Sequence, residues 1–293
     1  MKFRQVIIWG HPLHTNTFSY VQSSFYKAFK RLGYEAHWLD NTPENAQGTF
    51  DNCLFLTESQ VDSHMPVVKG CKYVLHNCDQ ARYAEVQDDV LLLQVFSLDC
   101  IGRDERINRY TYMSPDGKCL YQPWATDLLP DEIDIEIDRL GKVERERTVH
   151  WVGTIGEGRF GNKPEIGGFK RACDEQGIGF KKWGRVSDED HMNYIRRSYV
   201  APQICGSWQV DNGYIPCRIF KNISYGQHGI TNAKVIQDLF DGQLIYNPDT
   251  YQLFHDAEEQ KDKQDLKALM EAVRDEHTYI NRIERILSVL EQR

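Results

Sequence analysis

The 293-residue sequence lacks the features that mark several classes of protein. It contains no Cys-x-x-Cys pair, and its eight cysteines are scattered, so neither a zinc site nor a dense disulfide framework is expected. No apolar run approaches the ~18 residues that a membrane span needs. The first residues enter a strand pattern directly, without the apolar region of a signal peptide. These absences favour a cytoplasmic protein with reduced thiols and no integral membrane segment.

Basic residues are not in excess either. The 35 lysines and arginines are outnumbered by 43 aspartates and glutamates, so the formal net charge is -8. This balance disfavours a general surface for nucleic acids or anionic membranes, although a local basic pocket for a nucleotide is compatible with it. The histidines show no metal-ligand spacing, and no Asp-x-Asp pair lies at the end of a predicted strand. We therefore expect no bound metal and no cofactor.

The length exceeds that of a usual single core, which predicts two domains. Strand and helix patterns alternate along the chain, as in doubly wound α/β domains. The first half predicts strands at 3–9, 34–39, 53–57, 72–76 and 89–97, a helix at 17–32, and a hairpin at 110–124 around Ser114-Pro-Asp-Gly117. The highly charged segment 130–147 suits a connection between domains.

The same plan then restarts. The second half predicts strands at 149–152, 179–183 and 242–246, and helices at 164–176, 188–197 and 250–256. An amphipathic helix or helix pair is predicted for 265–291. We expect an N-terminal domain over 1–140, a C-terminal domain over 146–276, and a last helix, about 277–293, that packs back on the first domain.

The most informative segment is Gly213-Tyr-Ile-Pro-Cys-Arg-Ile-Phe-Lys-Asn-Ile-Ser-Tyr-Gly226. A proline-bearing approach leads into a short helix that opens with Arg218 and presents Asn222 on its polar face. Backbone N–H groups of a first helical turn suit a phosphate, and an arginine there can grip a diphosphate with two hydrogen bonds. The alternative is a buried helix with a solvated arginine.

A glycine-rich loop, 153–161, follows the first strand of the second half. Gly153 and Thr154 would let the backbone approach a ligand, and Arg159 and Lys163 add two cations. The loop matches neither the Rossmann nor the P-loop glycine pattern, so an ordinary surface turn is the alternative. The polar segment 207–211, which ends in Asp211, could touch the same ligand or only shape a turn.

Two polar places in the first half could also carry chemistry. The loop after the first strand contains His14, with Thr15 and Asn16 beside it, and one of its residues is expected to cap the next helix. The strand at 72–76 ends in His76, followed shortly by Asp79, and either side chain could accept a proton or bind a hydroxyl. A structural histidine and a helix-capping aspartate are the alternatives.

The second half resembles glycosyltransferases of the GT-B fold, of the retaining group-one or family-four type. Gly153 with Arg159 and Lys163 is similar to the loop that holds the donor diphosphate in that family. Residues 215–226 resemble the family's R-x-F-E-x-x-x-x-G helix, and 243–249 the strand and turn after it. Residues 8–17 are similar to the acceptor-facing loop of short transferases, including those of large algal viruses.

The resemblance implies an α/β chain with two Rossmann-like domains facing a central cleft, the first for the acceptor and the second for a nucleotide-sugar donor. The implied donor-binding residues are Gly153, Thr154, Arg159, Lys163, Asp211, Arg218 and Asn222. A GDP-sugar such as GDP-mannose is slightly preferred over a UDP-sugar. A glycan, a protein-linked glycan or a lipid would be the acceptor. A homodimer is one possible assembly.

The implied reaction is a metal-free transfer of the sugar to a hydroxyl group. Retention is favoured, with the leaving phosphate assisting the acceptor, whereas inversion would need a base, for which His14, His76 and Asp79 are the candidates. One departure stands out: the family's paired glutamates would fall on Gly213 and Lys221. The expected ribose contact must then come from elsewhere or be absent.

Two other classes fit the pattern less well. An NAD-dependent sugar-nucleotide epimerase would carry GxGxxG after the first strand, where this chain has Gly10-His-Pro-Leu-His. A two-lobed binding protein for a sugar or nucleotide would usually carry a secretion signal.

Overall fold

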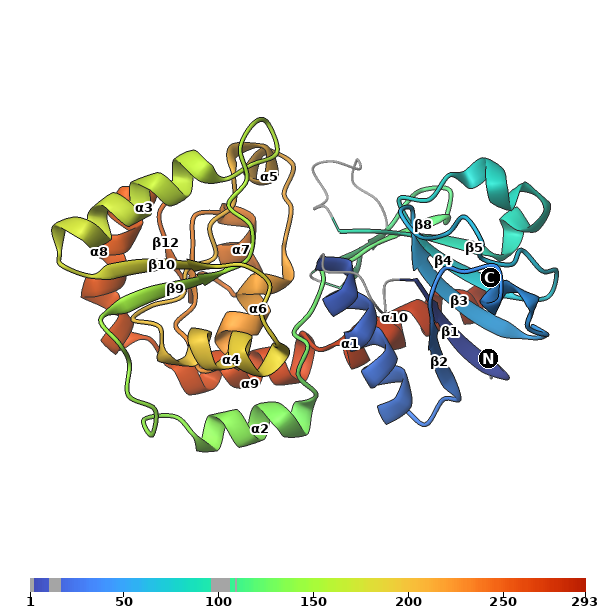
Figure 1. Ribbon diagram of the computed structural model, residues 1–293, viewed down its shortest axis with the longest axis horizontal. Coiled ribbons are helices and arrows are strands. Elements are labelled where there is room, and N and C mark those ends of the chain that lie inside the picture. Colours follow the sequence, from blue (N-terminus) through green and yellow to red (C-terminus); the bar gives the residue numbers. More distant parts are fainter. Residues whose placement is uncertain (1–2, 11–16, 96–105, 109) are drawn as a thin grey trace. The chain divides into compact units, whose positions relative to one another are not determined.

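The computed structural model describes residues 3–10, 17–95, 106–108 and 110–293, and the chain divides into two compact units (Figure 1). Unit 1 consists of Met1–Asp127 together with Tyr279–Arg293, and unit 2 of Leu128–Thr278. The sequence predicted a border near residue 140, whereas the contacts place it at residues 127 and 128. Each unit is described by itself below.

Unit 1 is built on a sheet with the strand order β2-β1-β3-β4-β5-β8-β7-β6. Pairing is parallel from β2 to β8 and antiparallel from β8 to β6. The strands are β1 (Gln5–Trp9), β2 (Ala36–Leu39), β3 (Cys53–Glu58), β4 (Lys72–His76), β5 (Val90–Gln94), β6 (Arg106–Asn108), β7 (Thr111–Met113) and β8 (Cys119–Tyr121). The predicted hairpin is confirmed as β7 and β8, where Gly117 adopts a φ of 66° and its N–H donates to the Ser114 carbonyl at 2.8 Å.

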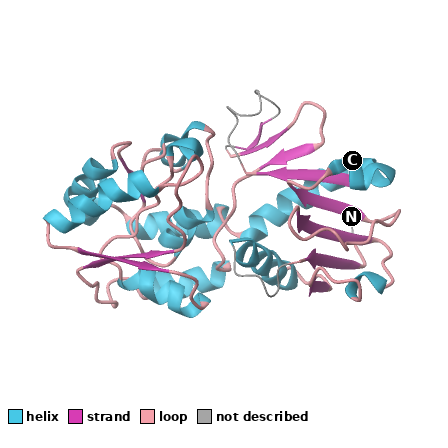
Figure 2. Ribbon diagram, turned by 45° about the horizontal axis from the view of Figure 1, so that its top comes forward, coloured by secondary structure: helices cyan, strands magenta, loops and turns pink. Residues whose placement is uncertain are grey.

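Both faces of this sheet are covered, which explains why its central strands are almost continuously apolar. One face carries an aromatic core in which the rings of Phe55 and Tyr73 stack at 5.3 Å. Tyr83, from the 3-10 segment η2 (Gln80–Asp89), joins that core, and a second short 3-10 turn is η1 (Asn45–Gln47). Helices α1 (Thr17–Arg31) and α10 (Tyr279–Gln292) pack against each other. Phe25 and Tyr279 are in edge-to-face contact at 4.6 Å. Figure 2 shows the strands of this sheet with helices beside them.

The predicted C-terminal amphipathic segment is a helix pair whose members belong to different units. Helix α9 (Leu266–Glu276) lies in unit 2, and α10 packs in unit 1. Arg282 of α10 is only 1% exposed, and it donates from Nε to the Pro123 carbonyl at 2.8 Å and from Nη2 to the Trp124 carbonyl at 3.1 Å. The last helix is thereby fastened to the end of the first unit's own chain segment.

Unit 2 contains two short parallel sheets, β9 with β10 and β11 with β12. The segment 198–206 links them, because Tyr199 N–H donates to the Thr148 carbonyl and Gln203 N–H to the Ile230 carbonyl. The strands are β9 (Thr148–Val152), β10 (Gly179–Trp183), β11 (Ile230–Thr231) and β12 (Ile245–Tyr246). The helices are α2 (Pro130–Asp138), α3 (Lys163–Glu175), α4 (Asp188–Arg197), α5 (Ser207–Asp211), α6 (Cys217–Ser224), α7 (Lys234–Leu239), α8 (Thr250–Gln260) and α9, with the 3-10 turn η4 (Lys261–Lys263).

The segment 130–147, predicted as a connection, begins with helix α2. Pro130 suits the first position of a helix, and Ile133 is fully buried beneath it. The helix packs on α9, where Arg274 pairs with Asp134 at 2.8 Å. Some of its charged residues pair with other residues of unit 2, as Asp134 does with Arg274. Its high charge density therefore does not mark a connection between domains, as the sequence had predicted.

Candidate functional site

The first candidate site lies where β9 ends and α6 begins. Pro216 precedes α6, and Arg218 is the second residue of the helix. Its guanidinium lies 4.0 Å from the centroid of the Trp151 ring of β9. A Cβ added to Gly153 would lie only 2.9 Å from Arg218 Nη2, and Gly153 has a φ of 121°. The fold therefore brings together Gly153 and Arg218, two of the predicted donor-binding residues.

Among the residues that the structure describes, no acidic side chain pairs with Arg218. Burial lowers the pKa of its guanidinium to about 10, so the group is still protonated at neutral pH. Within the described part of the chain, Arg218 makes no hydrogen bond and no ion pair, and its guanidinium contacts the face of the Trp151 ring. A partly desolvated cation with unused N–H groups is costly unless an anion joins it. This arrangement is suited to a phosphate.

Arg159 and Lys163 are exposed and have nearer partners in the structure. The Arg159 guanidinium lies 5.5 Å from the Phe160 ring centroid, and Lys163 forms an ion pair with Glu157 of the same loop. Phe160 is 65% exposed and meets Trp208 edge-to-face at 4.9 Å. Arg159 and Lys163 are thus exposed at the two ends of this stretch, and the structure shows no contact between either of these two described side chains and Arg218.

The glycine-rich loop is held tightly at its base. Gly206 approaches the loop so closely that an added Cβ would lie 1.9 Å from the Gly161 carbonyl oxygen. Glu165, in the first turn of α3, accepts from Ser207 N–H at 3.0 Å and from Ser207 Oγ at 2.7 Å. These contacts join α3 to α5 beside the loop. Glu165 and Gly206 could not be selected from the sequence pattern, because they are more than forty residues apart and only the fold brings them together.

The remaining predicted donor-binding residues divide into exposed and buried ones. Asp211, the last residue of α5, and Thr154 are exposed. Asn222 is 1% exposed and donates from Nδ2 to the Ala201 carbonyl at 2.8 Å. It faces the core rather than the polar side of α6, which corrects the sequence interpretation. Lys221, where the resemblance expects a glutamate, is also buried, with Nζ 3.4 Å from His191 Nδ1.

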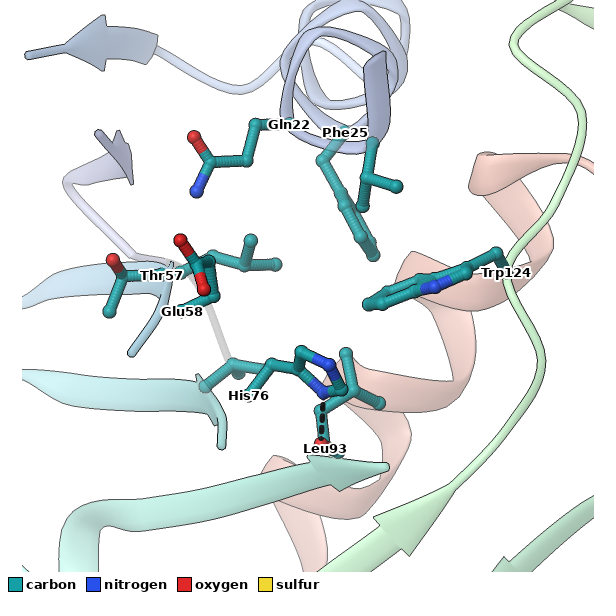
Figure 3. Close-up of a pocket in the computed structure, with 10 residues that line it drawn as sticks. Gln22, Phe25, Thr57, Glu58, His76, Leu93 and Trp124 are labelled. Atoms are coloured by element: carbon teal, nitrogen blue, oxygen red, sulfur yellow. Dashed lines mark hydrogen bonds between the residues drawn. The ribbon is translucent and has the colours of Figure 1, made fainter. Parts of the chain in front are cut away.

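The second candidate site is a pocket at the carboxyl ends of β3 and β4 in unit 1 (Figure 3). Glu58 and His76 are neighbours in the parallel register, and both are buried. Gln22, Phe25 and Trp124 complete its walls, and the His76 and Trp124 rings meet edge-to-face at 5.1 Å. The cavity volume is about 10 Å³, which is room for about one water molecule or one hydroxyl group.

The hydrogen bonds of His76 define its chemical state. Nδ1 lies 2.8 Å from the Leu93 carbonyl, which can only accept, so Nδ1 carries the proton. Nε2 then accepts from Asn77 Nδ2 at 3.1 Å. Burial lowers the pKa of His76, which favours the neutral ring at neutral pH. His76 is consequently a hydrogen-bond acceptor whose lone pair is already used by Asn77.

Glu58 was missed at the sequence level because the strand was expected to end at Thr57. The structure extends β3 by one residue, which places the carboxylate on the pocket wall at 3% exposure. Gln22 Nε2 and Thr57 Oγ1 both donate to the Trp9 carbonyl at 3.0 Å and hold the end of β1 beside it. Open parallel sheets usually bind ligands at the carboxyl ends of their strands, beside the point where the strand order reverses.

The other two catalytic candidates have different outcomes. Asp79 is exposed and accepts from Ala81 N–H at 3.0 Å, so it caps η2, the structural alternative considered above. His14, with Thr15 and Asn16, lies outside the described residues.

Among the residues that the structure describes, no group of three histidine, cysteine or acidic side chains could hold a metal ion. No helix in the same ranges is long and apolar enough to cross a membrane.

Comparison with known proteins identifies the fold. No family model and no curated protein sequence matches the chain. An alpha-glucosyltransferase solved with UDP and DNA is 8% identical, with a TM-score of 0.56 over 99% of this chain and 100% of that chain. A glycosyltransferase from Rickettsia africae is 9% identical, with a TM-score of 0.56 over 99% and 98%. A trehalose 6-phosphate synthase from Burkholderia multivorans is 9% identical, with a TM-score of 0.55 over 100% and 99%.

These similarities show that the chain has the GT-B fold of glycosyltransferases. The predicted α/β fold class is thereby confirmed. At such low identity the comparison concerns the fold, and the activity has to be argued from the residues of this chain.

Proposed function

We propose that the protein is a glycosyltransferase that moves a sugar from a nucleoside diphosphate donor to a hydroxyl acceptor. The observation that carries the proposal is Arg218, a charged and partly buried guanidinium at the start of α6 and beside Gly153, with no acidic partner in the described ranges. The guanidinium and the first N–H groups of the helix would bind the diphosphate together. The GT-B fold supports the same assignment.

The nucleotide is proposed on a different basis. The sequence slightly favoured a GDP-sugar, but the structurally similar alpha-glucosyltransferase was solved with UDP, and several similar synthases are named as UDP-forming. We therefore propose a UDP-sugar as the first donor and a GDP-sugar as the second.

In the proposed mechanism the diphosphate leaves as negative charge develops on it, and Arg218 stabilises that charge. Lys163 would exchange Glu157 for a phosphate oxygen, and Arg159 could turn from Phe160 in the same way. Retention is proposed, because the leaving phosphate can itself take the acceptor proton. A protein base is then unnecessary, which agrees with His76 having its Nε2 lone pair engaged by Asn77.

Release of nucleoside diphosphate from UDP-glucose, UDP-galactose and GDP-mannose tests this function. We expect turnover with one of these donors in the presence of EDTA, since guanidinium and ammonium groups supply the positive charge. The anomeric configuration of the product, read by NMR, is expected to match that of the donor. Strict dependence on added Mn²⁺ would contradict the metal-free mechanism, and an inverted product would contradict retention.

A further inference from the structure

A second cavity in unit 2 has an unusual concentration of arginine. It has a volume of about 240 Å³ and is lined by residues of α2, the loop after it, and the ends of α4 and α6. Three of the lining residues are Arg139, Arg145 and Arg196, and Glu136 is the acidic one. Gly226 lies beyond the C-terminal end of α6, whereas Arg218 is at its start, so the cavity and the proposed diphosphate site lie at opposite ends of that helix.

Glu136 is engaged by two of the three arginines. It is 5% exposed and accepts from Arg139 Nη1 at 2.8 Å and from Arg196 Nε at 2.6 Å. Arg196 also donates from Nη1 to Asn193 Oδ1 at 2.9 Å. One carboxylate therefore bonds two guanidinium groups and fixes their position on the cavity wall, but it cancels only one of their two charges.

Arg145 is the third cation and has little protein bonding of its own. Nη2 donates to the Gly226 carbonyl at 3.0 Å, and this is its one hydrogen bond within the described ranges. Burial lowers the pKa of its guanidinium, although the nearby Asp262 carboxylate acts in the opposite direction. Asp262 is exposed and does not line the cavity. Most N–H groups of a partly desolvated guanidinium are thus available beside an open space.

The rest of the wall is apolar. Leu140, Val143 and Leu266 line the cavity along with the charged residues. Such a mixture suits a ligand with an anionic end and an organic end. The excess of two positive charges over Glu136 matches a phosphate monoester, which carries about -1.5 to -2 charges at neutral pH.

We propose that this cavity is a second ligand site, which binds a small organic phosphate monoester. Arg145 and Arg139 hold the phosphate by charge-assisted hydrogen bonds, and the organic group packs on Leu140, Val143 and Leu266. The site is separate from the proposed sugar-nucleotide site, and it does not depend on the proposed activity.

Calorimetric titration with phenyl phosphate tests this proposal. The protein used carries Arg218→Gln, so that the proposed diphosphate site does not take up the probe. We expect saturable binding, and weaker binding of inorganic phosphate, which has no group for the apolar wall. Adding Arg145→Gln should lower the affinity for phenyl phosphate by about ten- to a hundredfold, the effect of losing a charged hydrogen bond.

Two further variants make the test decisive. Lys142→Gln removes the same charge from an exposed position in the same loop and should change the affinity by less than about twofold. Val143→Trp leaves every charge in place but fills the cavity, so it should abolish binding even if Arg145→Gln proves unstable. Circular dichroism of each variant confirms that it is folded.

Three results would overturn the proposal: no binding to the Arg218→Gln protein, unchanged binding after Val143→Trp, or equal affinity for phenyl phosphate and inorganic phosphate. If phenyl phosphate binds the unaltered protein but not Arg218→Gln, the cavity is not a site while the glycosyltransferase assignment stands. If phenyl phosphate binds the Arg218→Gln protein and no sugar nucleotide binds the unaltered protein, the cavity is a ligand site and the glycosyltransferase assignment fails.

Discussion

Replacing Arg218 by alanine is expected to weaken UDP binding by about 1.5 to 3 kcal/mol, the contribution of hydrogen bonds to a charged group. The guanidinium lies against Trp151 and beside Gly153. It forms no ion pair with any residue of the described ranges, so its loss removes phosphate contacts and breaks no ion pair there. Calorimetric titration of the variant with UDP and with GDP measures the change. The fold should be retained for the same reason.

Two companion variants sharpen this experiment. Arg218→Lys keeps the charge but loses the two-pronged guanidinium, and it should bind with intermediate affinity. Arg171→Ala is the matched control, since Arg171 is an exposed residue of α3 whose guanidinium lies 5.1 Å from the Tyr251 ring centroid. A folded Arg218→Ala protein with unaltered affinity for both nucleotides would mean that the diphosphate is not bound there.

Replacing Arg282 by methionine is expected to destabilise unit 1 by about 2 to 4 kcal/mol, because the Pro123 and Trp124 carbonyls would lose their partner inside the protein. Methionine fills a similar length, so the change keeps most of the packing but removes the guanidinium, with its hydrogen bonds and its contact 5.1 Å from the Tyr110 ring centroid. Urea unfolding followed by tryptophan fluorescence measures the effect.

Arg285 on the same helix provides the control. It is exposed, and Arg285→Met should change the free energy of unfolding by less than about 0.5 kcal/mol. Equal effects of the two substitutions would show that the helix is not fastened through Arg282. Because the Trp124 ring lies in the pocket with His76, loss of this fastening should also disturb that pocket.

The regular elements were predictable where their pattern was local. Strand β4 and helix α4 lie where the sequence placed them, because apolar runs and a 3.6-residue period are signals of the element itself. Helix α2 was missed because its charged residues have partners far along the chain, such as Arg196 for Glu136. The orientation of Asn222 depended on which face of α6 meets Ala201, and a single-helix pattern does not reveal that.

The candidate sites show the same division. The resemblance assigned Gly153 and Arg218 to one donor site, and the structure brings these two residues together. The pairing of Lys163 with Glu157 was not predicted, because the sequence contains no signal for which nearby acidic residue an exposed lysine will bind. The arginine cavity was invisible at that level, because its three cations come from separate segments that only the fold brings together.

The most direct test is a calorimetric titration of the unaltered protein, in EDTA, with UDP, GDP and ADP and with their sugar derivatives. Saturable binding of one nucleoside diphosphate and its sugar is expected, with the affinity reduced in Arg218→Ala and retained in Arg171→Ala. Absence of binding by all of these nucleotides up to about 1 mM, the upper end of usual substrate affinities, would contradict the assignment of a sugar-nucleotide site to unit 2.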